Sequence, residues 1–424
     1  MRGLGRLRLP SLLFFKAGEA QPPQTPHSLP GREKSMAAGR LRFCPSITEV
    51  PAPAWDACAG PDNPFVSHAF LHALEASGSV GEGTGWGPLH AVLEDARGRV
   101  RACAPLYAKS HSYGEYVFDW EWARAYQRAG GRYYPKLQGA VPFTPVTGPR
   151  LLAPPQDPER RDWQAALLEG LLDFARRLNV SGLHLTFVPD DETPLLADKG
   201  LLLRQGFQYH WENPGYRDFD DFLASLTSRK RKALRKERER ANRQGIRFLT
   251  LQGAAITERH WDAFDRFYRD TVDRKWGGAY LTRDFFLRLG ATMGDRVVLV
   301  MGEEDRPNGA LVCGALNLVG GDTLYGRTWG AAGDARFLHF EACYYRALDY
   351  AIAHGLNRVE AGAQGEHKIS RGYRPRATWS AHWLADPALG RAVAEFITHE
   401  RALVAQAMVA LADDGPFRAE DPCS

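Results

Sequence analysis

Two patterns of apolar positions alternate along the chain from Leu41 onward. Short apolar runs at residues 89–93 and 100–107 flank the polar turn 95–98, which predicts a β-hairpin. Longer stretches, such as residues 163–178, carry apolar side chains three or four positions apart, which predicts amphipathic helices. Together the two patterns predict an α/β fold.

One supersecondary unit occurs twice. The tetrapeptide Leu-Asp-Phe-Ala at residues 172–175 recurs as Leu-Asp-Tyr-Ala at residues 348–351, and the same offset of 176 aligns Leu183 with Val359. Each tetrapeptide lies in a predicted helix that is followed by a predicted strand. We therefore infer that the fold contains an internal duplication.

A second match supports the duplication. Residues 203–207 align with residues 369–373, and each copy is predicted to form a short helix that a glycine closes before another strand. The later copy shows the clearer order: a strand, two helices, three antiparallel strands, a long helix, a strand, a short helix and a final strand. These elements are predicted at residues 246–251, 258–274, 282–292, 297–301, 310–318, 322–328, 337–354, 357–361, up to 372, and 378–384.

A length of 424 residues favours two domains, because single cores stop growing near roughly 250 residues. Residues 1–40 are rich in Arg and Pro and lack an apolar pattern, so they are excluded from the fold as a disordered extension, a transit peptide, or sequence upstream of a start at Met36. The predicted domains span residues 41–215 and 216–385. Residues 386–424 are predicted to form a C-terminal helix and tail.

Composition and charge exclude several classes. Hydrophobic residues make up 44% and charged residues 25% of the chain, which is typical of a globular protein. The net charge is +4, but residues 1–40 hold seven Lys or Arg against two Glu, so the folded body is nearly neutral. A whole-surface attraction to nucleic acid or membrane is therefore not expected.

Cysteine usage and hydropathy bear on the compartment. Six scattered cysteines indicate a reducing compartment, and without zinc-site spacing we assign no metal. No run approaches the roughly 18 apolar residues that span a bilayer. We expect a cytoplasmic protein, with organelle targeting as an alternative if residues 1–35 are a transit peptide.

Several phrases of the sequence resemble a known family. They are Tyr-Tyr-Pro-Lys-Leu at residues 133–137, Val-Pro-Phe-Thr-Pro-Val-Thr-Gly-Pro-Arg at 141–150 and Gly-Ala-Gln-Gly-Glu-His-Lys at 362–368. The element order resembles the GNAT acyltransferase fold. The tandem copy and the basic segment 228–236 resemble the Fem-type branch, within which the chain is similar to proteins labelled as peptidoglycan biosynthesis or recognition proteins.

The resemblance implies two tandem GNAT-like domains with mixed, largely antiparallel sheets flanked by helices. It also implies an N-acyltransferase that moves an acyl or aminoacyl group from a CoA thioester or an aminoacyl-tRNA to an amine on a small molecule or peptide. The GNAT pyrophosphate loop pattern is met loosely by residues 327–332. The second domain is expected to hold the chemistry, because the first shows no polar cluster comparable to residues 362–368.

The basic segment is a candidate donor site. Ten Lys or Arg lie between residues 229 and 247 against Glu237 and Glu239, and such a density attracts the phosphates of CoA or tRNA. The predicted donor-binding residues are Arg231, Lys232, Arg235 and Lys236. The alternative is a solvated helix with a narrow apolar seam.

Glu341 is a candidate general base for the attacking amine. Its spacing places a carboxylate inside the apolar stripe of the long helix, where burial raises a carboxyl pKa. The alternative is a structural acid that pairs with an Arg or a neighbouring strand.

The turn after the strand 357–361 is a second candidate site, since ligands commonly bind at strand ends in α/β folds. His367 is the predicted catalytic base there, because an imidazole accepts protons near neutral pH. The predicted substrate-binding residues are Glu360, Gln364, Glu366 and Lys368. The alternative is a turn-forming and capping role.

Aromatic and acidic residues interleave at positions 119–122, so Trp120 is a candidate for stacking on a sugar or peptide acceptor. Burial in the core is the alternative. A different class of function also remains open at this point: a non-catalytic binding module for a cell-wall fragment or RNA, which would use the basic segment without Glu341 or His367.

Overall fold

The computed structural model describes residues 39–418 except 276–277 and 334–336. The predicted extension 1–40 lies outside the described residues apart from its last two positions. We call residues 39–215 the first half and residues 216–418 the second half. The first-half strands are β1 (Arg40–Cys44), β2 (Trp86–Pro88), β3 (His90–Glu94), β4 (Val100–Ala104), β5 (Leu106–Lys109), β6 (Lys136–Gly139), β7 (Gly182–Val188) and β8 (Leu202–Glu212). Its α-helices are α1 (Ala52–Ala59), α2 (His68–Ala76), α3 (Trp120–Arg128), α4 (Arg160–Leu178) and α5 (Thr193–Asp198).

The second half follows the predicted order of elements. Its strands are β9 (Ile246–Gln252), β10 (Val297–Glu304), β11 (Leu311–Gly320), β12 (Thr323–Ala331), β13 (Arg358–Glu360) and β14 (Arg374–Leu384). Its helices are α6 (Phe219–Ala224), α7 (Ser228–Asn242), α8 (Glu258–Lys275), α9 (Arg283–Met293), α10 (Leu338–Phe340), a π-helical stretch (Glu341–Tyr345), α11 (Arg346–Ala353), a 3₁₀ helix (Glu366–Arg371) and α12 (Pro387–Asp413). The predicted long helix is thus one helix with a π-helical turn inside it.

The hairpin and the repeated helix–strand unit are confirmed. β3 and β4 pair antiparallel across the predicted turn. The two matched tetrapeptides lie in α4 and α11, and Leu183 and Val359 lie in the strands that follow.

The second sequence match was wrong in the first half. Residues 203–207 belong to strand β8, whereas residues 369–371 lie in the predicted short helix. The first-half counterpart of that helix is α5, and each is followed by a glycine in the left-handed region, Gly200 with φ +81° and Gly372 with φ +88°. Gly206 misled the prediction, because it lies within a strand instead of closing a helix.

The strands form two sheets. A three-stranded sheet has the order β1-β3-β4, and an eleven-stranded sheet has the order β2-β5-β6-β7-β14-β8-β13-β12-β11-β10-β9. The large sheet is mixed: β6 pairs parallel with β7 and β12 pairs parallel with β13, while its other neighbours run antiparallel. This arrangement matches the predicted mixed, largely antiparallel α/β fold.

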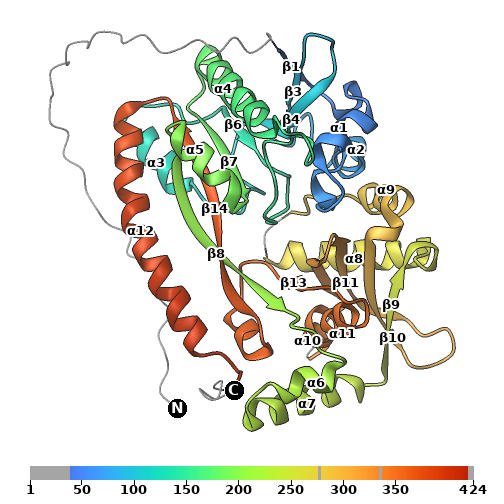
Figure 1. Cartoon of the computed structure of the whole chain (residues 1–424). Helices are drawn as coiled ribbons and strands as arrows, with labels where there is room; N and C mark the ends of the chain where they lie inside the picture. The colour runs from blue at the N-terminus through green and yellow to red at the C-terminus, as the bar shows by residue number, and fades with distance from the viewer. Residues whose placement is uncertain (1–38, 276–277, 334–336, 419–424) are drawn as a thin grey trace. The chain divides into compact units, whose positions relative to one another are not determined.

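The closing strand of each half is exchanged with the other half. The repeat makes β13 the counterpart of β7 and β14 the counterpart of β8. Yet β8 pairs with β13, and β14 pairs with β7, so each half completes the sheet of the other. β8 and β14 also pair with each other along their lengths, with Gly206 opposite Thr378, and lie side by side in Figure 1.

The exchanged pairs are equivalent in position. His382 lies opposite His184, and His210 lies opposite Glu360. In the repeat, Glu360 occupies the position equivalent to His184. On the exchanged strands, His382 occupies the position equivalent to His210. A pseudo-twofold axis therefore passes through the middle of the β8–β14 ladder. The division predicted at residue 215 stays a prediction, and β8 and β14 lie across it.

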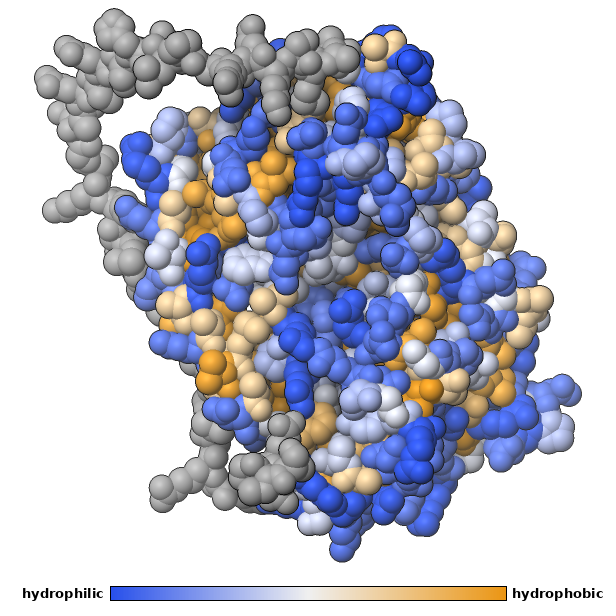
Figure 2. Space-filling view, viewed as in Figure 1, coloured by the Kyte–Doolittle hydropathy of each residue, from blue (hydrophilic) through white to orange (hydrophobic). Residues whose placement is uncertain are grey.

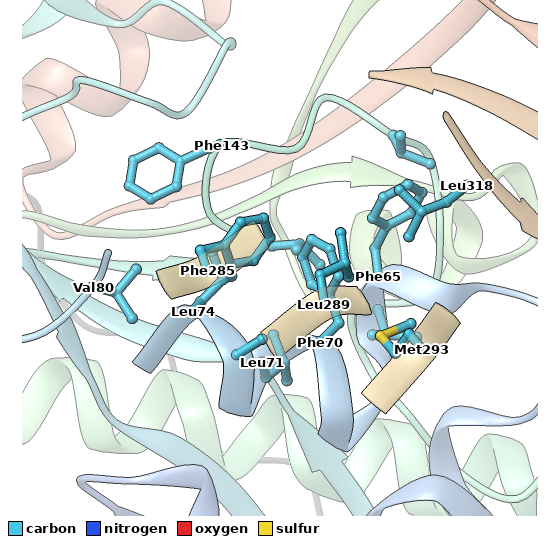
Figure 3. Close-up of a cluster of buried hydrophobic side chains, with 14 of the residues drawn as sticks. Phe65, Phe70, Leu71, Leu74, Val80, Phe143, Phe285, Leu289, Met293 and Leu318 are labelled. Carbon is cyan, nitrogen blue, oxygen red and sulfur yellow. The ribbon is translucent and has the colours of Figure 1, made fainter. Parts of the chain in front are cut away.

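Helices from both halves bury one shared core. α2 of the first half packs against α9 of the second. Figure 3 shows their side chains interdigitating, with Phe70 and Leu74 on α2 near Phe285 and Leu289 on α9. Burial of such side chains stabilises the fold by roughly 1.5–3 kcal/mol each. On another part of the sheet, α12 packs on β8 and β14.

Candidate active site

The second half contains a fork in the sheet. β12 and β13 pair in parallel only from Thr323 to Tyr325, opposite Arg358 to Glu360. Beyond that point β12 continues beside β11, whereas the chain after Glu360 follows β8, with the Ala361 N–H donating to Tyr209 O at 3.0 Å. We call the diverging segments 326–331 and 361–368 the fork. Arg327, at its start, is half-buried.

A β-bulge lies at the base of the fork. Thr328 is opposite Leu316 and Gly326 is opposite Asn317, so Arg327 is an extra residue in β12. Bulges redirect side chains and are common beside active sites. The Arg327 guanidinium donates to Phe143 O at 2.5 Å, which ties the bulge to the first half.

Glu360 is the acid nearest the fork on β13. Its side chain is buried, and it shares a sheet face with Tyr325 directly opposite. Burial raises the Glu360 pKa to about 7, against the opposing charges of Arg358 and Arg327. Arg358 Nε lies 3.3 Å from Oε1, while Oε2 has no hydrogen-bond partner among the described residues and lies 3.7 Å from His210 Nε2. This carboxyl is therefore placed to exchange a proton near neutral pH.

The other face of the fork holds an imidazole and a phenol. His367 is exposed, and its Nε2 lies 3.0 Å from the hydroxyl of buried Tyr344, so the two share a hydrogen bond. Burial, Arg371 and Lys368 lower the His367 pKa, so the ring is neutral at neutral pH. His339, on α10, has its ring 6.1 Å from the His367 ring.

Buried cations fix the turn that carries His367. Lys368 Nζ donates to Ala361 O at 2.6 Å and Gly362 O at 3.2 Å, and burial lowers its pKa to about 8. Arg371 donates to His367 O at 2.6 Å and pairs with Glu237 of α7 at 2.7 Å. The turn is therefore rigidly attached to the basic helix.

The basic segment forms helix α7, as predicted. Arg, Lys, Ala, Leu and Glu all favour helix, and the narrow seam of Leu234 and Ala241 is buried. Figure 2 shows hydrophilic residues over the lower part of the view, where Figure 1 places α6 and α7. Lys232 and Lys236 are exposed.

The cations of α7 point in different directions. Arg235 pairs with Asp220 of α6 at 2.8 Å, which is the side away from the Glu237–Arg371 pair. Arg240 lies one turn after Lys236 on the same helix face. The Arg240 guanidinium lies 5.9 Å from the ring centre of Phe337, just before α10. Arg240 therefore lies beside the start of the fork-side helix, with Lys236 one turn before it on the same face of α7, whereas Arg235 pairs on the α6 side.

The equivalent fork of the first half is filled by the chain itself. β6 and β7 pair only from Leu137 to Gly139. The following segment returns to β7, where Gly148 N–H donates to Phe187 O at 3.0 Å and the Arg150 guanidinium donates to Thr186 O at 2.8 Å. In the second half the residue after β12 stays beside β11, where Ala332 N–H donates to Val312 O at 2.9 Å, so no such return onto β13 is seen among the described residues.

A family model described as FemAB-like, peptidoglycan biosynthesis/recognition, matches residues 46–419. The chain belongs to the FemAB-like family. The crystal structure of FemX is similar over 84% of this chain and 100% of its own, at 12% identity and a TM-score of 0.52. The FemAB-like match and this likeness confirm the predicted Fem-type GNAT fold, and at such identity the structural likeness shows the fold alone.

Two further solved structures are similar to this FemAB-like chain. A tandem GNAT protein from the clavulanic acid biosynthesis pathway covers 82% of this chain and 99% of its own, at 14% identity and a TM-score of 0.46. The structure of L-PGS from Bacillus licheniformis covers 80% and 98%, at 12% identity and a TM-score of 0.47. No curated protein matches the sequence.

Glu341 is buried, as its position in the apolar stripe predicted, but it faces α7. Burial raises its pKa, and its carboxylate pairs with Arg346 at 2.9 Å and Arg238 at 3.3 Å. Arg238 also pairs with Asp349. The contacts fit the structural alternative, and a catalytic role for Glu341 in this FemAB-like protein remains a prediction.

The structure brings the other predicted site residues only partly together. Glu360, His367 and Lys368 meet at the fork, with exposed Gln364 and Glu366 on the same turn. Arg231 and half-buried Trp120 lie on other elements, α7 and α3. Sequence reasoning missed Tyr344 and His210, whose roles depend on partners far along the chain.

The first half holds a buried ion-pair network that the sequence analysis did not predict. Buried Lys136 donates to Glu115 at 2.7 Å and pairs with Asp119, while Lys109 lies 3.8 Å from Glu115. Burial works against the charge of Lys136, but the two carboxylates outweigh it and raise its pKa. The charged residues of this network come from separate segments of the chain, so no local sequence motif predicted it.

Two further observations concern metal ligands and membrane spans. No group of three or more His, Cys, Asp or Glu side chains within the described ranges is placed to hold a metal ion. Among the helices that the structure describes, none is both long and apolar enough to cross a bilayer.

Proposed function

We propose that this chain is an N-acyltransferase that moves an acyl or aminoacyl group from a CoA thioester or an aminoacyl-tRNA to an amine acceptor at the fork of the second half. The observation that carries the proposal is the buried Glu360 carboxyl at the base of the fork, beside the bulged strand β12. Membership of a family described as peptidoglycan biosynthesis/recognition supports it.

The donor would enter on the α10 side of the fork. Arg240 lies beside the start of α10, Lys236 lies one turn before it on the same face of α7, and their charges attract the phosphates of CoA or tRNA. The bulge at Arg327 takes a backbone amide out of the regular ladder, and such an amide stabilises a developing oxyanion.

Transfer then requires two proton movements. The acceptor nitrogen attacks the carbonyl carbon, a C–N bond forms, and the C–S bond of a thioester or the C–O bond of an aminoacyl ester breaks. Glu360, on the opposite sheet face, takes the proton from the amine. The leaving thiolate or ribose oxygen receives a proton from the Tyr344–His367 pair, whose phenol stays protonated because burial raises the Tyr344 pKa.

The acceptor would approach over an exposed aromatic loop of the first half. Tyr113, Tyr116 and Phe118 are 56%, 41% and 47% exposed, and the Phe118 ring lies 4.9 Å from that of Trp120. Large exposed aromatic patches commonly mark binding sites. The loop adjoins the bulge through Phe143, which donates from its N–H to Gly114 O at 3.1 Å and accepts from Arg327.

The proposal is tested by donor binding and by transfer. The full chain is mixed with acetyl-CoA, alanyl-tRNA or cell-wall peptides, and the melting temperature and the appearance of acylated peptide are followed. A shift and product with either donor support a transferase. A shift with cell-wall peptides alone, and no product with any donor, would instead identify a binding module.

Arg240→Ala should weaken donor binding about five- to tenfold, which corresponds to roughly 1–1.4 kcal/mol for one charge contact. The loss should shrink as salt rises, because the attraction is electrostatic. Titration calorimetry at two ionic strengths measures both effects. Arg235→Ala is the matched control, since Arg235 pairs with Asp220 on the α6 side. Equal losses in the two variants would contradict a donor face at Lys236 and Arg240.

A further inference from the structure

A small cavity lies beside the bulge of β12, on the same sheet face as Glu360. It measures about 20 Å³, which is enough for roughly one water molecule or one methyl group. Arg327 and Thr328 line it at the bulge, and Leu316 and Leu318 of β11 line it beside them. The cavity therefore adjoins the point at which the transferred carbonyl would be held.

The first half supplies much of the cavity wall. Phe65, Phe70 and Leu74 come from the segment around α2, and Phe143 follows β6. Across from them lie Phe285 and Leu289 of α9, and Figure 3 shows Leu74 beside Phe285. All six side chains are buried, so the wall is closely packed.

We propose that this cavity receives the substituent of the transferred acyl group, and that it restricts the donor to groups with a one-carbon apolar substituent, such as acetyl or alanyl. The inference rests on the proposed transferase function. With the carbonyl held at the bulge, the methyl group of acetyl is one bond from the carbonyl carbon, and the side-chain methyl group of alanyl is two bonds from it. Either methyl group reaches the adjoining cavity, and the α-ammonium of alanyl stays outside it. A cationic amine would lose its hydration against the largely apolar wall and would face the positive charge of Arg327.

Longer groups should be excluded by packing. Each extra methylene that is forced into a closely packed core displaces its neighbours from their preferred rotamers. The first half, whose own fork is filled, thus acts in the reaction by closing the acyl site of the second half. This assigns Leu74 as a specificity-determining residue that contacts the transferred group.

The test compares donors of increasing length on the full chain. Acetyl-, propanoyl-, butanoyl- and hexanoyl-CoA are supplied with one amine acceptor, and alanyl- and leucyl-tRNA are supplied in parallel. We expect kcat/KM to fall at least tenfold from acetyl to butanoyl, or from alanyl to leucyl. Leu74→Ala should raise the butanoyl-to-acetyl or leucyl-to-alanyl ratio at least tenfold.

Leu71→Ala is the matched control. Leu71 is a buried leucine on the same helix and in the same core, but it does not line the cavity. The measured quantity is the ratio of kcat/KM for a long donor to kcat/KM for a short donor, so a loss of folded protein affects both values equally and cancels. If the alanine variants do not fold, the milder Leu74→Val and Leu71→Val variants replace them. Equal ratios in the Leu74 and Leu71 variants, or equal use of long and short donors by the wild type, would overturn the inference and leave the transferase proposal standing. Absence of product with every donor would overturn both.

Discussion

Replacing Lys136 by methionine is expected to lower the free energy of unfolding by about 3–5 kcal/mol, because it leaves two acids buried without their cation. Lys136 has no exposed side-chain surface, and neither Glu115 nor Asp119 has more than a few per cent. Burial already raises the Glu115 pKa to about 7, and the loss of the ammonium would raise it further. Urea unfolding followed by circular dichroism measures the change.

Two controls separate charge from packing. The triple change Lys136→Met, Glu115→Gln, Asp119→Asn removes the buried charges together and should recover part of the loss. Arg124→Met breaks an exposed pair with Glu121 and should cost less than about 1 kcal/mol. A Lys136→Met protein within 1 kcal/mol of the wild type would show that the buried ion pairs of Lys136 contribute little to stability.

Glu360→Gln is expected to lower kcat by about 10²–10⁴, the usual contribution of a general base. In the wild type kcat/KM should rise with pH through the Glu360 pKa of about 7, since the carboxylate is the active form. The variant should lose that rise. Glu341→Gln is the discriminating control: it should keep its activity, because Glu341 is held by Arg238 and Arg346. The reverse result would favour Glu341 as the base.

Ionisation of Glu360 as the pH rises should lower the free energy of unfolding, whereas it should raise activity. Its folded pKa of about 7 exceeds the ordinary value of 4.5, so the folded chain keeps a proton that the unfolded chain loses. The resulting stability is present below pH 4.5 and is lost as pH rises through 7, by about 3 kcal/mol. Glu360→Gln should remove this part of the pH dependence of the unfolding free energy, which denaturant titrations at pH 5 and pH 8 compare.

The sequence predicted the second half better than the first, for physical reasons. Its meander and its helices have clear periodicity, so β10 to β12 and α8 and α9 formed where expected. β8 was mistaken for a helix because Gly206 within it reads as a helix end, while the pairing that makes it a strand comes from β14, far along the chain.

At the candidate site, the sequence predicted which side chains are buried better than it predicted which residues they contact. The apolar stripe correctly predicted that Glu341 is buried. Nothing in the neighbouring sequence predicted its ion pair with Arg238. Lys136 lies in a short, fully buried strand, a signal visible only once the strand is known to be central in the sheet. The polar turn was found because Glu360 and residues 364–368 are adjacent in sequence.

The strand exchange has a consequence for the origin and handling of the molecule. In a chain with only one copy of the unit, the sheet would have an unpaired strand edge and the final strand would have no partner. Two such chains could exchange their final strands and form a symmetric dimer. Joining the two subunits end to end would yield the present topology, after which the fork of one half was free to be filled by its own chain. Severing the polypeptide near residue 215 would leave each fragment with a bare sheet edge, so separately expressed fragments are expected to aggregate or to reassociate when mixed.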